Sequence, residues 1–184
     1  VVAWKRSMIA TACVRARQVR MGTEKPGMKR ALSLVLLITL CLAGQYRGPR
    51  PPKPDLPYLV HADNLIPTEV NEAREQTRGK QTIYVIPGAS SPARTPVPEP
   101  IFLFLSEKIA PEALELYRLE VKGNRRQIVF PERLKDRPRP LRLLIQRLED
   151  KLYKLEVSER FGLENGPYAI TPKGSNQVFC FDVY

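Results

Sequence analysis

The residues that could do chemistry in this chain are few and lie far apart. The single histidine, His61, stands two positions before Asp63. On an extended segment these two side chains would point the same way, which would suit a pair of metal ligands. A stable zinc site takes three or four protein ligands, and the sequence offers no second histidine. We therefore expect His61 at the surface near a strand end, and we predict no metal site.

Carboxylates occur in pairs at Glu149-Asp150, Glu156 with Glu159, and Glu112 with Glu115. Glycosidases use two carboxylates across a cleft, but acids scattered along a chain that is 27% charged are more typical of solvated faces. The sequence has no phosphate-binding glycine loop, no Cys-x-x-Cys and no nucleophile elbow. We predict no catalytic residues and no cofactor. A small hydrolase built from His61, Asp63 and the acidic pairs is the alternative.

Cysteine use is sparse, because Cys13 and Cys41 precede residue 45 and only Cys180 follows it. One cysteine cannot form an internal disulfide, so a hydrophobic core must hold the fold together. Cys180 stands between Phe179 and Phe181 and is expected to pack as a small apolar thiol.

Basic residues are concentrated between Arg125 and Arg147. This segment contains eight basic and two acidic residues, which give a local charge of +6. Part of this run is a proline-rich loop, and arginine forks suit phosphate and carboxylate groups. We name its central residues as a candidate anion-binding set: Arg133, Lys135, Arg137, Arg139 and Arg142. The alternative is a loop that only improves solubility.

The net charge of +11 resembles that of a nucleic-acid-binding protein until it is divided along the chain. Residues 1–27 contribute +5, Lys29 and Arg30 contribute +2, and residues 45–184 contribute +4. Most of the basic character therefore lies in segments that are not expected in the mature protein. Because aromatic residues are also not interleaved with the basic ones in the way that base stacking requires, we predict no nucleic-acid partner.

Residues 28–44 have the three parts of a cleavable secretory signal peptide. Lys29 and Arg30 form the positive n-region, residues 31–43 form an uncharged leucine-rich h-region, and small residues precede Gln45. The h-region is shorter than the ~20 apolar residues of a spanning helix. We expect a signal helix, export to the periplasm or the outside of the cell, and membrane contact only through this segment. Lipidation of Cys41 is the disfavoured alternative, because Leu40 precedes it.

The segments on either side of the signal peptide are expected to lie outside the folded domain. Residues 1–27 are basic and without pattern, which favours a spurious upstream extension over a long n-region. Residues 45–57 contain five prolines and should form an extended tether. The domain itself is expected to span residues 58–184.

Short apolar segments separated by turn residues predict strands through the domain. Residues 82–86 and 101–105 read as strands, the second as one buried on both faces. Residues 114–121 and 127–130 should form a hairpin around Lys122-Gly123-Asn124. Residues 168–171 and 177–184 should form another hairpin at the end of the chain. Residues 68–77 have a helix-forming composition with almost no apolar face, so we expect a short surface helix or a loop there.

Residues 141–157 fit two structures. Leu141, Leu144, Ile145 and Leu148 fall on one helical face, whereas residues 153–157 alternate as in a strand, with Glu149-Asp150-Lys151 as a turn. A hairpin is favoured over a helix because strands flank it.

About eight short strands with hairpin connections predict an all-β protein, an antiparallel β-sandwich of the immunoglobulin-like kind. We expect one core, built from alternating positions of the strands: Ile83, Val85, Phe102, Phe104, Leu119, Val121, Phe179, Phe181 and Val183. The terminal hairpin, Gly-Pro-Tyr-Ala-Ile-Thr-Pro followed by Val-Phe-Cys-Phe-Asp-Val, resembles the endings of uncharacterised exported bacterial β-sandwich proteins. That resemblance implies no activity.

These features together predict a non-catalytic binding or structural module of the cell envelope. Its partner would be an anionic envelope component or another exported protein. The second possibility besides a small hydrolase is an accessory subunit of an exported enzyme complex, whose partner supplies the chemistry.

Overall fold

The computed structural model describes residues 46–160 and 162–184. In this part of the chain every regular element is a strand except for two single-turn 3-10 helices, η1 (Pro111–Ala113) and η2 (Leu134–Asp136). The strands form antiparallel sheets that pack on one another, so the prediction of an all-β protein is confirmed. The upstream segment 1–27 and the signal segment 28–44 lie outside the described residues.

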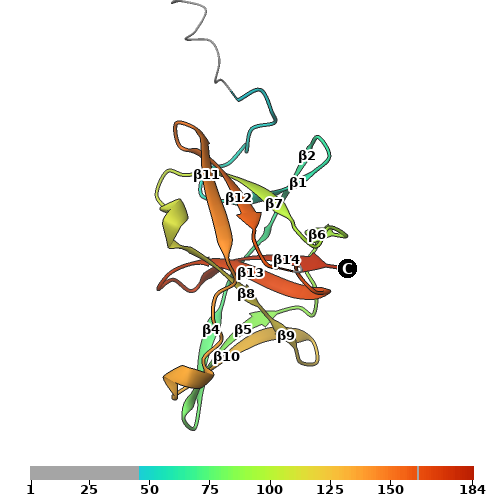
Figure 1. The fold of residues 1–184 in the computed structure, drawn as a ribbon. Helices are drawn as coiled ribbons and strands as arrows, with labels where there is room; N and C mark the ends of the chain where they lie inside the picture. Colours follow the sequence, from blue (N-terminus) through green and yellow to red (C-terminus); the bar gives the residue numbers. More distant parts are fainter. Residues whose placement is uncertain (1–45, 161) are drawn as a thin grey trace, which may run out of the picture. The chain divides into compact units, whose positions relative to one another are not determined.

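The strands form three sheets, which we call A, B and C (Figure 1). Sheet A has the order β11 (Leu143–Glu149), β12 (Leu152–Val157), β7 (Ile101–Leu105), β1 (Pro57–His61), β2 (Asn64–Pro67). Sheet B has the order β3 (Glu69–Glu72), β14 (Gln177–Val183), β13 (Gly166–Pro172), β8 (Leu114–Arg118), and the short β6 (Arg94–Thr95) also pairs with β14. Sheet C has the order β4 (Arg74–Arg78), β5 (Gln81–Pro87), β10 (Arg125–Pro131), β9 (Glu120–Val121).

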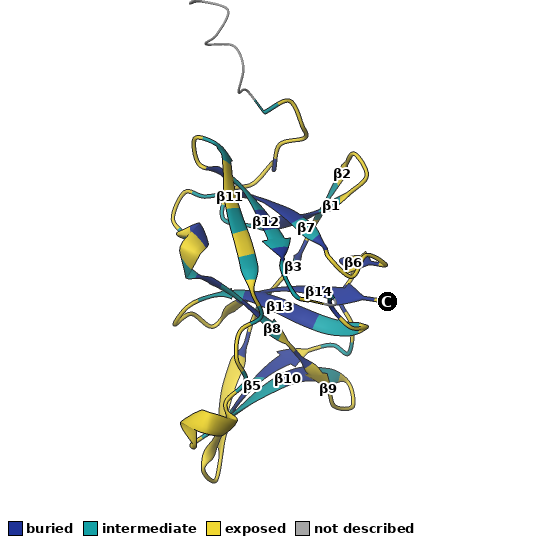
Figure 2. Cartoon of the chain, in the orientation of Figure 1, coloured by how far each residue is buried: buried dark blue, intermediate teal, exposed yellow. Residues whose placement is uncertain are grey.

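Sheet B is the central layer, because its strands contribute to two separate hydrophobic clusters. Its face toward sheet A joins Phe179 and Phe181 of β14 with Phe102 and Phe104 of β7. Its other face joins Cys180 of β14 with Ile86 of sheet C. Successive residues of a strand point to opposite faces, so a strand between two layers needs apolar residues at both parities. β14 has them and is buried from Val178 to Val183 (Figure 2).

The prediction of a single core is therefore corrected. Phe102, Phe104, Phe179, Phe181 and Val183 do share one cluster. Leu119 instead belongs to the second cluster. Ile83 and Val85 are buried but belong to neither, because Tyr84 and Ile86 are the β5 residues that face sheet B. Val121 lies on a two-residue strand at the edge of sheet C and is 52% exposed.

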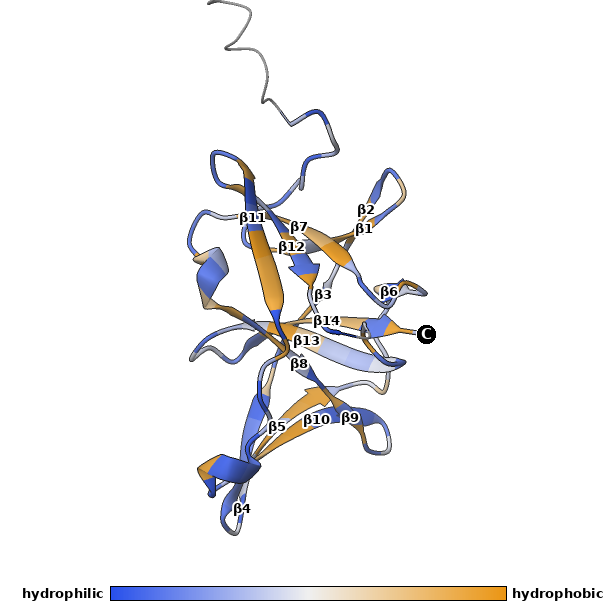
Figure 3. Ribbon diagram, in the orientation of Figure 1, coloured by the Kyte–Doolittle hydropathy of each residue, from blue (hydrophilic) through white to orange (hydrophobic). Residues whose placement is uncertain are grey.

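The hairpin predictions are confirmed for most strands. Residues 141–157 form the hairpin β11–β12 rather than a helix, with a bulge near Arg147 and a positive φ of 59° at Lys151 in the turn. β13 and β14 pair as expected. β7 is apolar along its length and buried on both faces at its centre (Figure 3).

The predicted hairpin 114–130 is only partly correct. Leu119 separates β8 from β9, and its backbone N–H donates to the Pro167 carbonyl of sheet B at 2.9 Å. β8 therefore pairs with β13, while the two residues of β9 alone pair with β10. One continuous segment thus belongs to two layers.

Residues 68–77 are not a helix or a loop but two edge strands. β3 pairs with β14 of sheet B, and β4 pairs with β5 of sheet C, with buried Ala73 between them. Because each strand has a paired neighbour on one side, polar β4 needs no apolar face of its own (Figure 3). The pairing was not visible in the local sequence.

The proline-rich segment has contacts with the domain. The Asp55 carboxylate accepts hydrogen bonds from the backbone N–H groups of Glu107, Lys108 and Ile109, each at 3.0 Å. Arg50 forms an ion pair with Glu149 of β11. The end of this segment is therefore fixed against sheet A.

Candidate functional site

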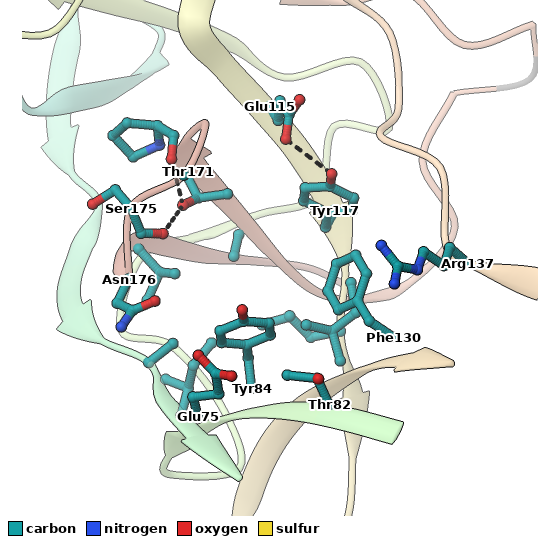
Figure 4. A pocket seen from close by; sticks show the side chains of 18 residues that line it. Glu75, Thr82, Tyr84, Glu115, Tyr117, Phe130, Arg137, Thr171, Ser175 and Asn176 are labelled. Atoms are coloured by element: carbon teal, nitrogen blue, oxygen red, sulfur yellow. Dashed lines mark hydrogen bonds between the residues drawn. The ribbon is translucent and has the colours of Figure 1, made fainter. Parts of the chain in front are cut away.

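A cleft of about 440 Å³ opens between sheets B and C (Figure 4). This volume is within the range of small-ligand sites, about 300–1,000 Å³. Its lining combines apolar, aromatic and hydrogen-bonding side chains: Ala73, Glu75, Thr82, Tyr84, Ile86, Glu115, Tyr117, Leu119, Ile128, Phe130, Arg137, Ala169, Thr171, Pro172, Gly174, Ser175, Asn176 and Val178.

The two sheets are in close contact at one end and separate toward the cleft. On β10 the residues that face sheet B are Arg126, Ile128 and Phe130; the first is fully buried and the other two are partly exposed. On β5 the corresponding residues change from buried Ile86 to partly exposed Tyr84. Exposure increases in the same direction on both strands, so the space between the sheets widens toward Phe130 and Tyr84.

The closed end is held by a buried arginine. Arg126 donates two hydrogen bonds to the Glu69 carboxylate of β3, at 2.8 and 3.0 Å, and two more to the carbonyls of Pro87 and Gly88. Burial alone would raise the pKa of Glu69, but the hydrogen bonds from Arg126 and Asn71 outweigh it, and the pKa is lowered. The ion pair therefore joins the central sheet to sheet C.

Asp182 lies at the same end and is buried. Its Oδ2 accepts a hydrogen bond from the Ser91 backbone N–H at 3.0 Å, whereas its Oδ1 has no partner among the described residues. Burial raises the pKa of Asp182, and the opposing effects of the Ser91 hydrogen bond and the Arg126 charge do not cancel it.

Three aromatic rings line the open end. Phe130 lies between Tyr84 and Tyr117, with ring centroids 5.7 and 5.8 Å away and interplanar angles of 87° and 76°. Such edge-to-face contacts are favourable because the positive edge of one ring meets the negative face of another. The three rings come from β5, β10 and β8, so both sheets contribute to this wall.

Each tyrosine of the wall has a neighbouring carboxylate. The Tyr117 hydroxyl donates to Glu115 at 2.9 Å, and burial together with this carboxylate raises the pKa of Tyr117 to about 12. Burial and the Glu75 carboxylate raise the pKa of Tyr84. Glu115 comes from sheet B and Glu75 from sheet C, so carboxylates lie on both sides of the cleft.

The turn between β13 and β14 forms part of the rim. Thr171 Oγ1 donates to the Gln177 carbonyl at 2.8 Å, which keeps the turn closed. The Asn176 carbonyl accepts from the Ala73 N–H at 2.8 Å. The side-chain amide of Asn176 has no hydrogen bond to another described residue and lines the cleft, so it is free to bind a ligand.

The predicted anion-binding residues all lie on the connection between β10 and β11. The side chains of Arg133, Lys135, Arg137, Arg139 and Arg142 are exposed, and none forms an ion pair with a described residue. Arg137 alone of the five lines the cleft, where its Nε donates to the Pro131 carbonyl at 3.0 Å. Arg126, by contrast, is buried, so the basic run is not one continuous surface.

The other sequence candidates do not come together. His61 ends β1 and pairs with Asn64 across a two-residue turn that contains Asp63, so the extended geometry assumed for the pair is absent. Over residues 46–160 and 162–184 there is no group of three or more histidine, cysteine or acidic residues that could hold a metal ion. Cys180 is fully buried, as expected, and burial raises its pKa to about 12.

Of the three carboxylate pairs, only Glu115 lines the cleft. Glu149 pairs with Arg50, and Glu156 pairs with Lys154. The sequence does not identify Tyr84, Tyr117 and Phe130 as site residues, because alternating aromatic residues in strands usually indicate a core. What distinguishes the two tyrosines is a neighbouring carboxylate: Glu115 lies on the same strand as Tyr117, and Glu75 lies opposite Tyr84 on the paired strand β4.

Neither a protein-family model, a curated protein nor a solved structure matches this chain. Within the described residues no helix has the length and apolar character needed to cross a bilayer.

Proposed function

We propose that this protein is a non-catalytic binding module of the cell envelope, and that it holds part of its partner in the cleft between sheets B and C. The observation behind this proposal is the composition of the cleft. An apolar floor, three aromatic rings and unengaged polar groups at the rim are the usual features of a recognition site. Location in the periplasm or outside the cell is supported by the signal-like segment 28–44 and can be tested by sequencing the N-terminus of the exported protein.

We also propose that the domain is an immunoglobulin-like β-sandwich. Antiparallel sheets packed face to face are typical of sandwich modules, and the immunoglobulin-like kind presents binding surfaces on such a frame.

The cleft can be blocked without disturbing the fold. Asn176 lies in an exposed turn, its side-chain amide is unengaged, and its φ is not positive. Asn176→Trp should therefore fill the mouth of the cleft. Lys173→Trp places the same side chain in the same turn but outside the cleft, and serves as the matched control.

The test is co-sedimentation of the exported protein with purified envelope fractions. We expect Asn176→Trp to lose binding and Lys173→Trp to retain it. Equal binding by both variants would show that the cleft is not the site. Turnover of an envelope polymer by the wild type would instead favour the small hydrolase, and binding only in the presence of an exported enzyme would favour the accessory subunit.

The five exposed basic residues support a second candidate surface, for an anionic envelope component. Attraction to an anionic membrane is on the order of 1 kcal/mol for each basic residue, and it weakens as salt shortens the screening length to ~8 Å. Changing Arg133, Lys135, Arg137 and Arg139 to glutamine should reduce binding to anionic vesicles and leave binding to neutral vesicles unchanged. Binding that is indifferent to salt would exclude this surface.

A further inference from the structure

The charged residues that line the cleft are Glu75, Glu115 and Arg137, so their net charge is opposite in sign to that of the protein as a whole. Glu75 and Glu115 lie on its two sides. Neither forms an ion pair with a described residue, although several other glutamates do. Each of these carboxylates accepts a hydrogen bond from a tyrosine hydroxyl at most and has no ion-pair partner among the described residues, so a positively charged ligand would complement them.

The aromatic wall favours the same sign of charge. Ring faces are electron-rich and attract ammonium and guanidinium groups. The Tyr117 hydroxyl already donates a hydrogen bond to Glu115, so it is not available as a donor to an anion. Carboxylates at the ring edges therefore strengthen the attraction for a cation and oppose the binding of an acid.

The floor of the cleft fits an apolar stem. Ile128, Leu119 and Val178 line the cleft together with the aromatic wall and the turn 172–176. Lysine and arginine side chains combine a methylene stem with a charged end, so the stem would cover this floor while the charged end meets the carboxylates.

The surroundings of the cleft fit an extended polypeptide. Two further hollows adjoin it, and all three share Asn176; one continues past Glu72 and Arg74, the other past Val70. They follow β3 and β4, each of which pairs on only one side within the described residues. Unpaired strand edges can receive an extended chain by backbone hydrogen bonds.

Resting on the proposed function, we infer that the cleft binds a lysine or arginine side chain from an extended segment of a partner polypeptide. Arg137 at the rim opposes this cation, since it has the same charge. Its removal should tighten binding, which is the opposite of its expected effect at an anion-binding surface. The direction of the change in affinity when Arg137 is removed therefore distinguishes binding in the cleft from binding to the exposed basic residues.

The experiment uses the full chain and a short blocked peptide with a central lysine, followed by calorimetry and NMR chemical-shift changes. The same peptide with norleucine keeps the stem without the charge, and free N-acetyl-lysine methylamide keeps the side chain without the flanking peptide. We expect the lysine peptide to bind about tenfold more tightly than the norleucine peptide, the ratio that corresponds to 1.4 kcal/mol, and more tightly than the free amide.

The variants locate this effect. Glu115→Gln should reduce the advantage of lysine over norleucine, whereas Glu120→Gln, the same change on β9 outside the cleft, should not. Arg137→Gln should tighten binding by about threefold, the size expected for a partly exposed charge pair, and Arg139→Gln should have little effect.

Three results would overturn the inference but not the proposed function. Equal binding of lysine and norleucine peptides would make the cleft an apolar site, and equal binding of the peptide and the free amide would make it a small-amine site. Binding of neither peptide would also overturn it. The proposed function fails separately, if Asn176→Trp leaves binding to envelope fractions unchanged.

Discussion

The guanidinium of Arg126 on β10 and the carboxylate of Glu69 on β3 share two hydrogen bonds, at 2.8 and 3.0 Å. The arginine side chain is fully buried, and that of Glu69 is 23% exposed. This pair joins sheet C to the central sheet at the end where the two are in contact. The cleft opens at the other end, so the ion pair holds the two sheets together at the closed end of the cleft.

Replacement of Arg126 by methionine should destabilise the protein by about 3 kcal/mol, because it leaves a carboxylate without its partner at a largely dry interface. Adding Glu69→Met should recover part of this loss, since it removes the unpaired charge. Arg125→Met, at the neighbouring position, is the control. Denaturant unfolding measures all three, and equal losses for Arg125→Met and Arg126→Met would contradict the structural role of the pair.

Asp182 should make stability depend on pH. Burial raises its pKa above the usual 3.8, so the folded state holds the proton more tightly than the unfolded state does. The contribution of this residue to stability is thus present at low pH and is lost as pH rises above 3.8 through the raised pKa of the folded state.

The variant Asp182→Asn keeps the shape of the side chain and the Ser91 hydrogen bond but cannot ionise. Its stability relative to the wild type should increase across that pH range, as measured by unfolding at a series of pH values. Asp63→Asn, the same change in an exposed turn, is the matched control. A constant difference between Asp182→Asn and the wild type would mean that Asp182 titrates alike in both states.

Phe181 tests the packing of the central strand. It is fully buried, stacks on Tyr168 with centroids 5.6 Å apart, and contacts the Phe102 ring edge-to-face at 4.9 Å. Phe181→Ala should cost about 3–5 kcal/mol, the range for a buried phenylalanine. Val70→Ala, at a side chain that is 53% exposed, should change the free energy of unfolding little. A loss below about 1 kcal/mol for Phe181→Ala would contradict this packing.

The strands could be predicted from the sequence where one property repeats locally. Residues 101–105 are uniformly apolar. In residues 177–183, which follow the turn residues 172–176, Phe179, Phe181 and Val183 occupy alternate positions. Both segments are therefore predicted correctly as strands. The arrangement of the sheets in three layers could not be predicted from the sequence. Val178 and Cys180 lie on the face of β14 opposite Phe179 and Phe181, and nothing in the local sequence indicates that sheet C covers this face. The assignment of residues 68–77 failed because the stability of β3 and β4 comes from strands distant in sequence.

The candidate site shows the same difference between local and distant information. Arg137 was identified from a run of basic residues, and it does line the cleft. Tyr84, Tyr117 and Phe130 belong to strands that look like ordinary core strands. They form one wall because β8 belongs to sheet B, whereas β9, which follows Leu119, pairs with β10 of sheet C.

Hydrogen exchange of the full chain, with and without the envelope fraction that binds it, tests most directly whether this protein binds through the cleft. We predict slower exchange in residues 81–87, 114–118 and 172–177, which surround the cleft, and no change in residues 132–142 apart from Arg137. Protection confined to residues 132–142, with the strands of the cleft unchanged, would contradict the account and assign binding to the basic segment.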